Sequence, residues 1–261
     1  MSQFILQTDS AGFDMEYFLI KEQLNKNYHV FKHTQCSLDR LLSIATKDDY
    51  PVGDTEFVST FLKNFHGIYN QNPIEIPKYL RTERFLKRDY RIVEFKDIPK
   101  DGQFFLKDVS QLHAFSSIVN PFYEDIFSWF EPPYDPNSVQ LVLNKEHLFQ
   151  VSEVYDIEAE YRVYVCRGEI KHVAHFCGNA LFAPDMELIE DVIRLILDNE
   201  PYLKSFVIDV MVGPKGTAIV EIRNFTSVNL YNILWGSELV FAYKDGIEYL
   251  LNDNRVLTPD K

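Results

Sequence analysis

The sequence is poor in glycine and lacks the short motifs that identify several common enzyme classes. Only 10 of its 261 residues are glycine, so the glycine-rich loops that often cradle phosphate are scarce. It contains no Walker-type phosphate loop and no dinucleotide-binding fingerprint. The zinc-protease helix motif and the nucleophile elbow are also missing. The protein classes that are identified by these motifs are therefore excluded.

Cysteine is rare as well. Cys36, Cys166 and Cys177 are odd in number and have no Cys-x-x-Cys spacing, which argues against a disulfide framework or a zinc site and fits a reducing compartment. The first residues lack a basic start followed by an apolar run, and no stretch is long enough to span a membrane. We expect a cytoplasmic protein without a signal peptide.

Positive charge is in deficit, with 26 basic against 39 acidic residues and a formal net charge of -13. This balance disfavours binding to nucleic acid or to an anionic membrane, because both require a basic surface. Five basic residues nevertheless gather in one short segment: Arg81, Arg84, Lys87, Arg88 and Arg91. This basic cluster is a candidate anion site, and a solvated helix face is the alternative.

Apolar and aromatic residues are abundant: 46% of the chain is hydrophobic, with 21 Phe and 15 Tyr. Such a chain can bury one large core or two small ones. A strand-helix-strand pattern begins the chain, with its helix over residues 15–24. The strand-helix-strand beginning is typical of an α/β layer. Further helices are predicted after Asp54 and over residues 79–87, 185–200 and 229–235. Strands are predicted over residues 139–143 and 149–155, after an aromatic loop near Trp129.

The most distinctive stretch is residues 206–224, which alternate as a hairpin with an acid inside each apolar strand. A three-residue loop ending at Gly216 would pair Gly213 with Thr217 and set Asp209 opposite Glu221. Facing carboxylates repel unless a cation lies between them, and magnesium is a natural candidate. The alternative is that Arg223, on the face of Glu221, neutralises the pair as a buried ionic cluster.

Two further strands carry charge. Lys107 ends the apolar strand 103–107, where a buried lysine needs an anionic partner, so we consider phosphate alongside a lysine that reaches solvent. Glu160 and Arg162 share one face of the strand 160–166. An ordinary ion pair between them is one interpretation.

The order of these motifs resembles the ATP-grasp superfamily, and in particular a clade of small phage- and bacteria-encoded members named for two arginines and a lysine. The resemblance covers roughly Leu80 to Trp235. The matching segments are Phe85-Leu86-Lys87-Arg88, Phe105-Leu106-Lys107, Ala114-Phe115, Ser152-Glu153-Val154, the strand from Glu160 to Val165, Asp209-Val210 and Glu221-Ile222. Each match is short, and their ordered combination is what makes the resemblance specific.

The resemblance implies an α+β ATP-grasp fold, in which two α+β layers clasp ATP. It divides the chain into a small α/β N-terminal domain over residues 1–80 and an ATP-grasp domain over residues 81–261. Its implied nucleotide contacts are Arg88 and Lys107 at the phosphates, the adenine hinge Glu153, Val154 and Tyr155, and Glu160. It also implies Mg2+ held by Asp209, Glu221 and Asn224, and a catalytic Arg162 that contacts an acylphosphate or a substrate carboxylate.

The activity that the resemblance implies is an ATP-dependent carboxylate-amine ligase. The γ-phosphate passes to a small-molecule or peptide carboxylate, and an amine acceptor captures the resulting acylphosphate, with release of ADP and phosphate. Less favoured is a kinase-like phosphotransferase on the same fold.

Two departures from the clade's pattern motivate another alternative. His113 stands where the clade has a second lysine, and Arg223 stands where a metal-binding Asn is expected. Asn224, one position later, can replace that ligand only if the strand bulges between it and Glu221. The alternative is a catalytically degenerate ATP-grasp protein that binds nucleotide or a protein partner.

Overall fold

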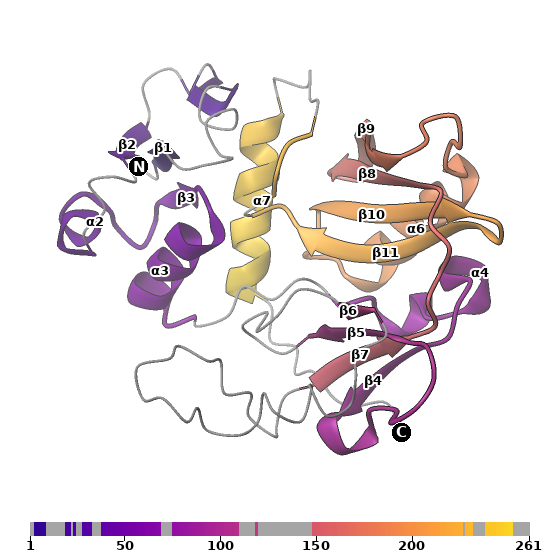
Figure 1. Ribbon diagram of the computed structural model, residues 1–261. Helices are drawn as coiled ribbons and strands as arrows, with labels where there is room; N and C mark the ends of the chain where they lie inside the picture. Colours follow the sequence, from indigo (N-terminus) through magenta and orange to yellow (C-terminus); the bar gives the residue numbers. More distant parts are fainter. Residues whose placement is uncertain are drawn as a thin grey trace.

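The computed structural model describes residues 3–8, 19–21, 23–24, 28–32, 38–68, 75–109, 118–119, 148–226, 228–231 and 238–252. Within these ranges the strands form three sheets (Figure 1). The predicted strand over residues 139–143 and the aromatic loop near Trp129 lie outside them. Of the helix expected over residues 15–24, residues 15–18 and 22 also lie outside them, and residues 19–21 and 23 are helical.

The N-terminal sheet is parallel, with the order β2-β1-β3. Its elements are β1 (Phe4–Thr8), β2 (Tyr28–Lys32), α2 (Leu38–Ile44), β3 (Tyr50–Val52) and α3 (Thr55–His66). Helix α3 begins as predicted, because the Asp54 carboxylate accepts a hydrogen bond from the Phe57 backbone N–H at 2.8 Å. It ends at Gly67 in the left-handed conformation. The α/β character predicted for this segment is confirmed.

The second sheet is antiparallel, with the order β4-β7-β5-β6. Its strands are β4 (Tyr90–Glu94), β5 (Phe105–Asp108), β6 (Ile118–Val119) and β7 (Leu148–Ser152), with the short turns η2 (Lys78–Leu80), α4 (Glu83–Leu86) and η3 (Phe95–Asp97). The single helix predicted over residues 79–87 is instead the two turns η2 and α4. Lys87, with φ of 54°, ends the second turn.

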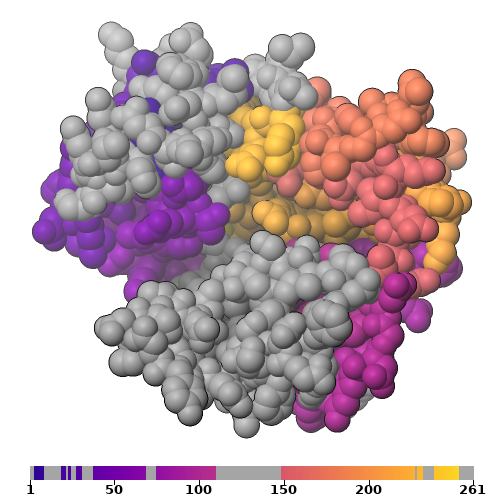
Figure 2. Space-filling view, in the orientation of Figure 1, coloured from indigo at the N-terminus to yellow at the C-terminus, as the bar shows by residue number. Residues whose placement is uncertain are grey.

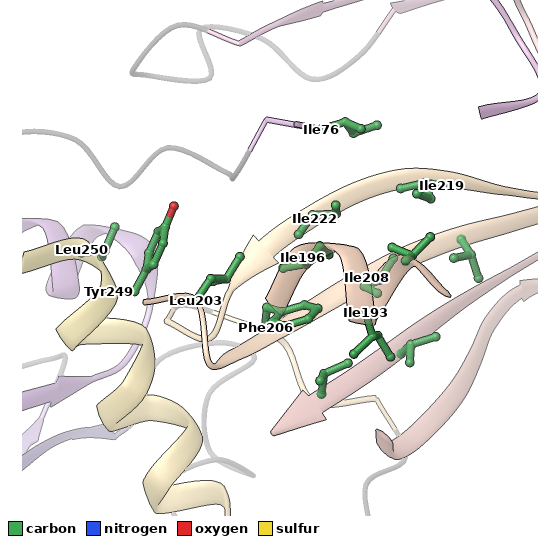
Figure 3. Packing of buried hydrophobic residues seen from close by; sticks show 14 of the residues in the cluster. Ile76, Ile193, Ile196, Leu203, Phe206, Ile208, Ile219, Ile222, Tyr249 and Leu250 are labelled. Carbon is green, nitrogen blue, oxygen red and sulfur yellow. The ribbon is translucent and has the colours of Figure 1, made fainter. Parts of the chain in front are cut away.

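The third sheet is antiparallel, with the order β11-β10-β8-β9. Its strands are β8 (Ala159–Cys166), β9 (Glu169–Gly178), β10 (Ser205–Gly213) and β11 (Gly216–Asn224), and α6 (Met186–Asn199) covers one face. Figure 3 shows Ile193 and Ile196 of α6 in the same apolar cluster as Phe206, Ile208 and Ile222 of the sheet. Arg162, Asp209 and Glu221 lie on the opposite face of this sheet, the charged face.

The β10–β11 hairpin has the predicted pairing of Asp209 with Glu221, but its turn has a different register. Gly213 pairs with Gly216 rather than with Thr217, so the register next to the turn is one residue shorter than predicted. A bulge between Asp209 and Val210 then restores the pairing, so that Asp209 lies opposite Glu221 as expected. The two acids therefore face each other as the sequence indicates.

Helix α7 (Leu239–Asn252) stands between the N-terminal sheet and the β8–β11 sheet (Figure 1). Leu6 and Val52 of the first sheet share a buried cluster with Ala242 and Tyr243 of α7 and with Val207 of β10. In Figure 2 the yellow helix shows at the surface beside the indigo N-terminal segment. The core is therefore continuous across the predicted boundary at residue 80, and the division into two domains stays a prediction.

None of the helices in the described ranges is long and apolar enough to cross a membrane.

Close packing of α7 gives a test of this arrangement. A Cβ at Gly246 would lie 2.2 Å from the backbone oxygen of Phe225. We expect Gly246→Ala to destabilise the fold by about 1–3 kcal/mol through overpacking, although Ala is favoured over Gly by about 0.5–1 kcal/mol in an ordinary helix interior. Urea unfolding followed by circular dichroism measures the change. The exposed Glu190→Ala on α6 is the control, and a stabilised Gly246→Ala variant would contradict the packing.

Candidate active site

Arg162 and Asp209 form a buried, bidentate ion pair at the centre of the charged face. They are direct neighbours on β8 and β10, and Nε and Nη2 of Arg162 donate to the two Asp209 oxygens, each at 2.7 Å. Burial lowers the pKa of Arg162, but the carboxylate outweighs burial and the pKa is raised. An ion pair between Arg162 and Glu160 was one interpretation of the sequence, and in the structure Arg162 is paired with Asp209 instead.

The hydrogen bonds of Arg162 do not use all of its N–H groups. Its Nη1 donates to the backbone oxygen of Asn229 at 3.2 Å, so the recorded hydrogen bonds use three of the five N–H groups of a guanidinium. The remaining two lie one on each terminal nitrogen, and an oxyanion can accept both. Asp209 thus fixes the guanidinium, and within the described part of the chain these two N–H groups have no recorded acceptor.

Glu221 is surrounded by two cations. Arg223 donates to it from Nε at 2.6 Å and from Nη2 at 3.0 Å, and the Lys107 ammonium lies 3.2 Å from Oε1. Burial alone would raise the pKa of Glu221, but Lys107 and Arg223 together hold it at about 2. The ionic cluster considered as the alternative is thus present in the structure, with Lys107 as a member that sequence did not assign to it.

Lys107 joins two sheets. It extends from β5 of the second sheet to Glu221 on β11 of the third, and its side chain is largely buried. The prediction that this lysine needs an anionic partner is therefore correct, and in the structure that partner is a carboxylate.

Arg88 is a buried cation for which the described residues supply no carboxylate partner. It lies just after α4, and its Nη1 donates to the backbone oxygen of Leu86 at 2.9 Å. Burial lowers the pKa of Arg88 to about 10, and no carboxylate opposes that effect among the residues that the structure describes. A buried guanidinium in this state is an electrostatic site for an anion.

The rest of the basic cluster differs from Arg88. Arg81 pairs with Glu75, and Arg84 pairs with Asp191 on α6. The solvated-face alternative fits Arg84, which is largely exposed, whereas the anion-site prediction fits Arg88.

A hinge, residues 153–158, connects the second sheet to the third. The strand predicted to extend to residue 155 ends at Ser152, so Glu153 and Val154 lie in this connection. The Glu153 N–H donates to the backbone oxygen of Asp89 at 3.1 Å, and its carboxylate accepts from Lys215 at 3.2 Å. Residues next to both sheets thus hold the start of the hinge.

Tyr155 fastens the hinge to the β10–β11 turn. Its hydroxyl donates to the Gly216 backbone oxygen at 2.6 Å. A Cβ at Gly213 would lie 2.1 Å from the backbone oxygen of Asp156, so only glycine allows the hairpin to approach this closely. Arg88 lies near enough to Tyr155 to affect its pKa, which brings the predicted adenine and phosphate contacts into one region.

Glu160 is an acceptor at the hinge end of β8. It shares the charged face with Arg162 and is half-buried. Its pKa is raised, first by burial and then by the charge of Asp209, while a hydrogen bond from Cys177 lowers it. Within the described ranges it has no basic partner, so its remaining lone pairs are open to a hydroxyl or amine donor.

Asn224 does not join the two acids. From Asp209–Glu221 to Phe206–Asn224 the pairing is regular, and the bulge lies on the other side of Glu221. Asn224 therefore lies on the face opposite Glu221, where its Oδ1 accepts from Thr226 at 2.6 Å. Its buried amide nitrogen has no hydrogen-bond partner among the residues that the structure describes. The bulge on which its prediction as a metal ligand depended is not there.

Asp209 and Glu221 have the chemistry to hold one hard cation together with ligands from elsewhere. A carboxylate has about four lone-pair sites, of which Asp209 uses two and Glu221 three in the contacts above. No group of three or more acidic, His or Cys side chains in the described part of the chain could hold a metal by itself. Mg2+ commonly takes one or two carboxylates and completes its shell with phosphate and water.

Two aromatic residues near Arg162 were not identified from the sequence. Phe176 of β9 and Tyr231 stack with ring centroids 5.3 Å apart, and the Arg162 guanidinium carbon lies 5.0 Å from the Tyr231 centroid. Residues 229–231, expected to begin a helix, are not helical. No local pattern marks Phe176, because a bulge between its neighbours directs its ring. His113 and the Ala114-Phe115 match lie outside the described residues.

Comparison with known proteins agrees with this architecture. The family model that matches describes an ATP-grasp domain, the second family of the clade named for two arginines and a lysine, and it spans residues 85–235, more than half of the chain. No curated protein matches. Among solved structures, D-alanine–D-alanine ligase from Bacillus anthracis complexed with ATP is similar with a TM-score of 0.50 and 16% identity, over 95% of this chain and 94% of that one.

Two further solved structures are similar at comparable levels. A RimK domain protein ATP-grasp from Sphaerobacter thermophilus gives a TM-score of 0.53 at 10% identity, over 96% of this chain and 98% of that one. N5-carboxyaminoimidazole ribonucleotide synthetase from Thermotoga maritima gives 0.52 at 11% identity, over 94% and 76%. At these identities the likeness shows the fold.

The ionic cluster predicts a pH-dependent stability. The pKa of Glu221 is about 2 in the folded chain against an ordinary 4.5, a difference of about 3 kcal/mol. Because the folded value is the lower one, this contribution is present above about pH 4.5 and is lost as the pH falls towards 2. We expect the excess stability of the wild type over Glu221→Gln to stay level above about pH 5 and to shrink between about pH 5 and pH 3.

Chemical denaturation at several pH values measures this excess. Glu190→Gln, at an exposed position of α6, is the matched control and should show no such trend. An excess that stays constant over the same pH range would contradict the pairing of Glu221 with Lys107 and Arg223.

Proposed function

The chain belongs to the ATP-grasp clade named for two arginines and a lysine, and from this premise we propose that it is an ATP-dependent carboxylate-amine ligase. Its reaction would proceed through an acylphosphate and release ADP and phosphate. The observation that carries the proposal is Arg88, a buried guanidinium without a carboxylate partner in the described ranges, beside the hinge between two sheets. Similar structures include a ligase complexed with ATP.

In this proposal the nucleotide lies between the second and third sheets. Arg88 and Lys107 bind its phosphates, since both are largely buried cations on the side of the site that carries β4 and β5. The adenine lies against Glu153, Val154 and Tyr155. Glu160, which has acceptor oxygens without a basic partner in the described chain, accepts from the ribose hydroxyls.

Asp209 and Glu221 would hold one Mg2+ together with the phosphates, and Asn224 takes no part. When bound, the ion supplies positive charge to the phosphoryl group that is transferred. The two acids suit this role because each keeps at least one lone-pair site beyond its contacts with basic side chains.

Arg162 would orient the acid substrate. Asp209 holds its side edge, and the two N–H groups that remain point a fork at the carboxylate or acylphosphate oxygens. A carboxylate oxygen attacks the γ-phosphorus and ADP leaves. The amine nitrogen then attacks the acyl carbon, phosphate leaves, and the nitrogen loses a proton to solvent. Arg162 stabilises the negative charge on oxygen in both steps.

The degenerate ATP-grasp protein is the second candidate. One observation favours it: Arg223 and Lys107 together occupy three of the lone-pair sites of Glu221, which leaves little room for a metal ion there. This candidate binds nucleotide or a protein partner and has no turnover.

Nucleotide binding is tested by calorimetric titration with Mg2+ and the non-hydrolysable analogue AMP-PNP. We expect Arg88→Ala to weaken binding by roughly 10- to 100-fold, because a charged hydrogen bond contributes about 1.5–3 kcal/mol. The matched control is Arg194→Ala, an exposed arginine of α6 that pairs with Asp191, which should bind normally. Absence of AMP-PNP binding by the wild type would rule out the ligase, and it would leave the degenerate protein only as a binder of a protein partner.

Turnover separates the two candidates. We expect a screen of amino acids and small peptides to reveal substrate-dependent release of ADP rather than AMP, with mass spectrometry identifying the joined product. Arg162→Ala should lower kcat by about 100- to 1,000-fold, since its charge acts on the reacting oxygens. Arg162→Lys should restore part of this rate. Tight nucleotide binding without any turnover across the screen would favour the degenerate protein.

A further inference from the structure

The stacked pair Phe176 and Tyr231 lies beside the group that the proposed reaction uses. Their rings are 5.3 Å apart at an interplanar angle of 17°. The guanidinium carbon of Arg162 is 5.0 Å from the Tyr231 centroid and 6.0 Å from the Phe176 centroid. An aromatic surface therefore lies directly beside the guanidinium of Arg162.

A distortion of the strand places Phe176 there. Glu160 pairs with Cys177 and Tyr161 pairs with His175, so Phe176 is an extra residue on β9. Such bulges re-aim a side chain and are common next to active sites. Here the ring of Phe176 is directed to the face of Arg162, where it stays 37% exposed.

The second ring is tied to the strand that carries Arg162. The Tyr231 backbone N–H donates to the Tyr164 hydroxyl at 2.8 Å, and this hydroxyl donates to the backbone oxygen of Asn229 at 2.9 Å. Arg162 donates to the same oxygen. Tyr164 is fully buried, and burial raises its pKa to about 12, so it is a stable donor. The position of Tyr231 relative to Arg162 is therefore fixed by hydrogen bonds.

We propose that Phe176 and Tyr231 form a specificity subsite for a planar, aromatic group attached to the carboxylate that Arg162 holds. This inference rests on the proposed function and narrows its acid substrate to aryl-bearing carboxylic acids, including acylated or peptide-linked ones. A flat ring stacks on the exposed part of Phe176 and displaces water from it. Small or doubly charged acids gain nothing from this surface.

The test compares N-benzoylglycine with N-acetylglycine, two carboxylates that differ in the aromatic ring. Their affinities for the complex with Mg2+ and AMP-PNP are measured by ligand-observed NMR titration. We expect N-benzoylglycine to bind about 3- to 10-fold more tightly, the range that aromatic stacking supplies. Phe176→Ala should abolish this preference while it still binds N-acetylglycine. Phe182→Ala, an exposed aromatic position after β9, is the matched control and should keep the preference.

Three results would overturn the subsite: equal affinities in the wild type, no binding of N-benzoylglycine at millimolar concentration, or a preference that survives Phe176→Ala. The third includes equal weakening of both acids by Phe176→Ala, because the rings would then act only by orienting Arg162. If AMP-PNP itself fails to bind, the proposed function fails. The same comparison on the free protein then still decides the subsite.

Discussion

The contact between Lys107 and Glu221 is the constraint on which the charged face depends, because it joins two sheets through oppositely charged and largely buried groups. Burying each charge costs desolvation energy of several kcal/mol, which the pairing roughly offsets. Such a pair adds little net stability, whereas removal of one partner leaves the other unpaired and destabilises the fold. Its main effect is therefore positional: it sets β5 against β11, with Arg162 already fixed by Asp209 nearby.

Arg88 differs from the neighbouring arginines in its pairing. Arg81 and Arg84 have carboxylate partners, and the two facing acids share three cations. Arg88 alone among these arginines is buried with only a backbone oxygen as a recorded acceptor. An anion that enters the site gains the full interaction with Arg88, because no carboxylate of the described chain competes for it. The asymmetry of pairing, more than the number of basic residues, thus indicates where a phosphate would bind.

Local pattern predicted the faces of the strands well, since alternation is a property of the backbone. It placed Asp209 opposite Glu221 although the turn is tighter than expected, because the bulge compensates for the shorter loop. Local pattern does not predict the order of the strands in the sheet. In the structure β10 lies beside β8, and this makes Asp209 the partner of Arg162. The bulge that directs Phe176 was equally hidden, because it depends on tertiary packing. Asn224 lies on the face opposite Glu221, because the strand between these two residues is regular and has no bulge.

Arg223 links the ionic-cluster and metal hypotheses. Its side chain is 38% exposed, against 8% for Arg162 and 16% for Lys107. A half-exposed ion pair contributes only about 0–1 kcal/mol, so Arg223 can leave Glu221 at small cost, whereas Lys107 cannot leave without a loss of burial. A divalent ion brought by phosphates competes with the weakest of the basic contacts. The ionic cluster is therefore compatible with a metal site in which Arg223 turns outward. This compatibility depends on the exposure of the Arg223 side chain more than on its charge.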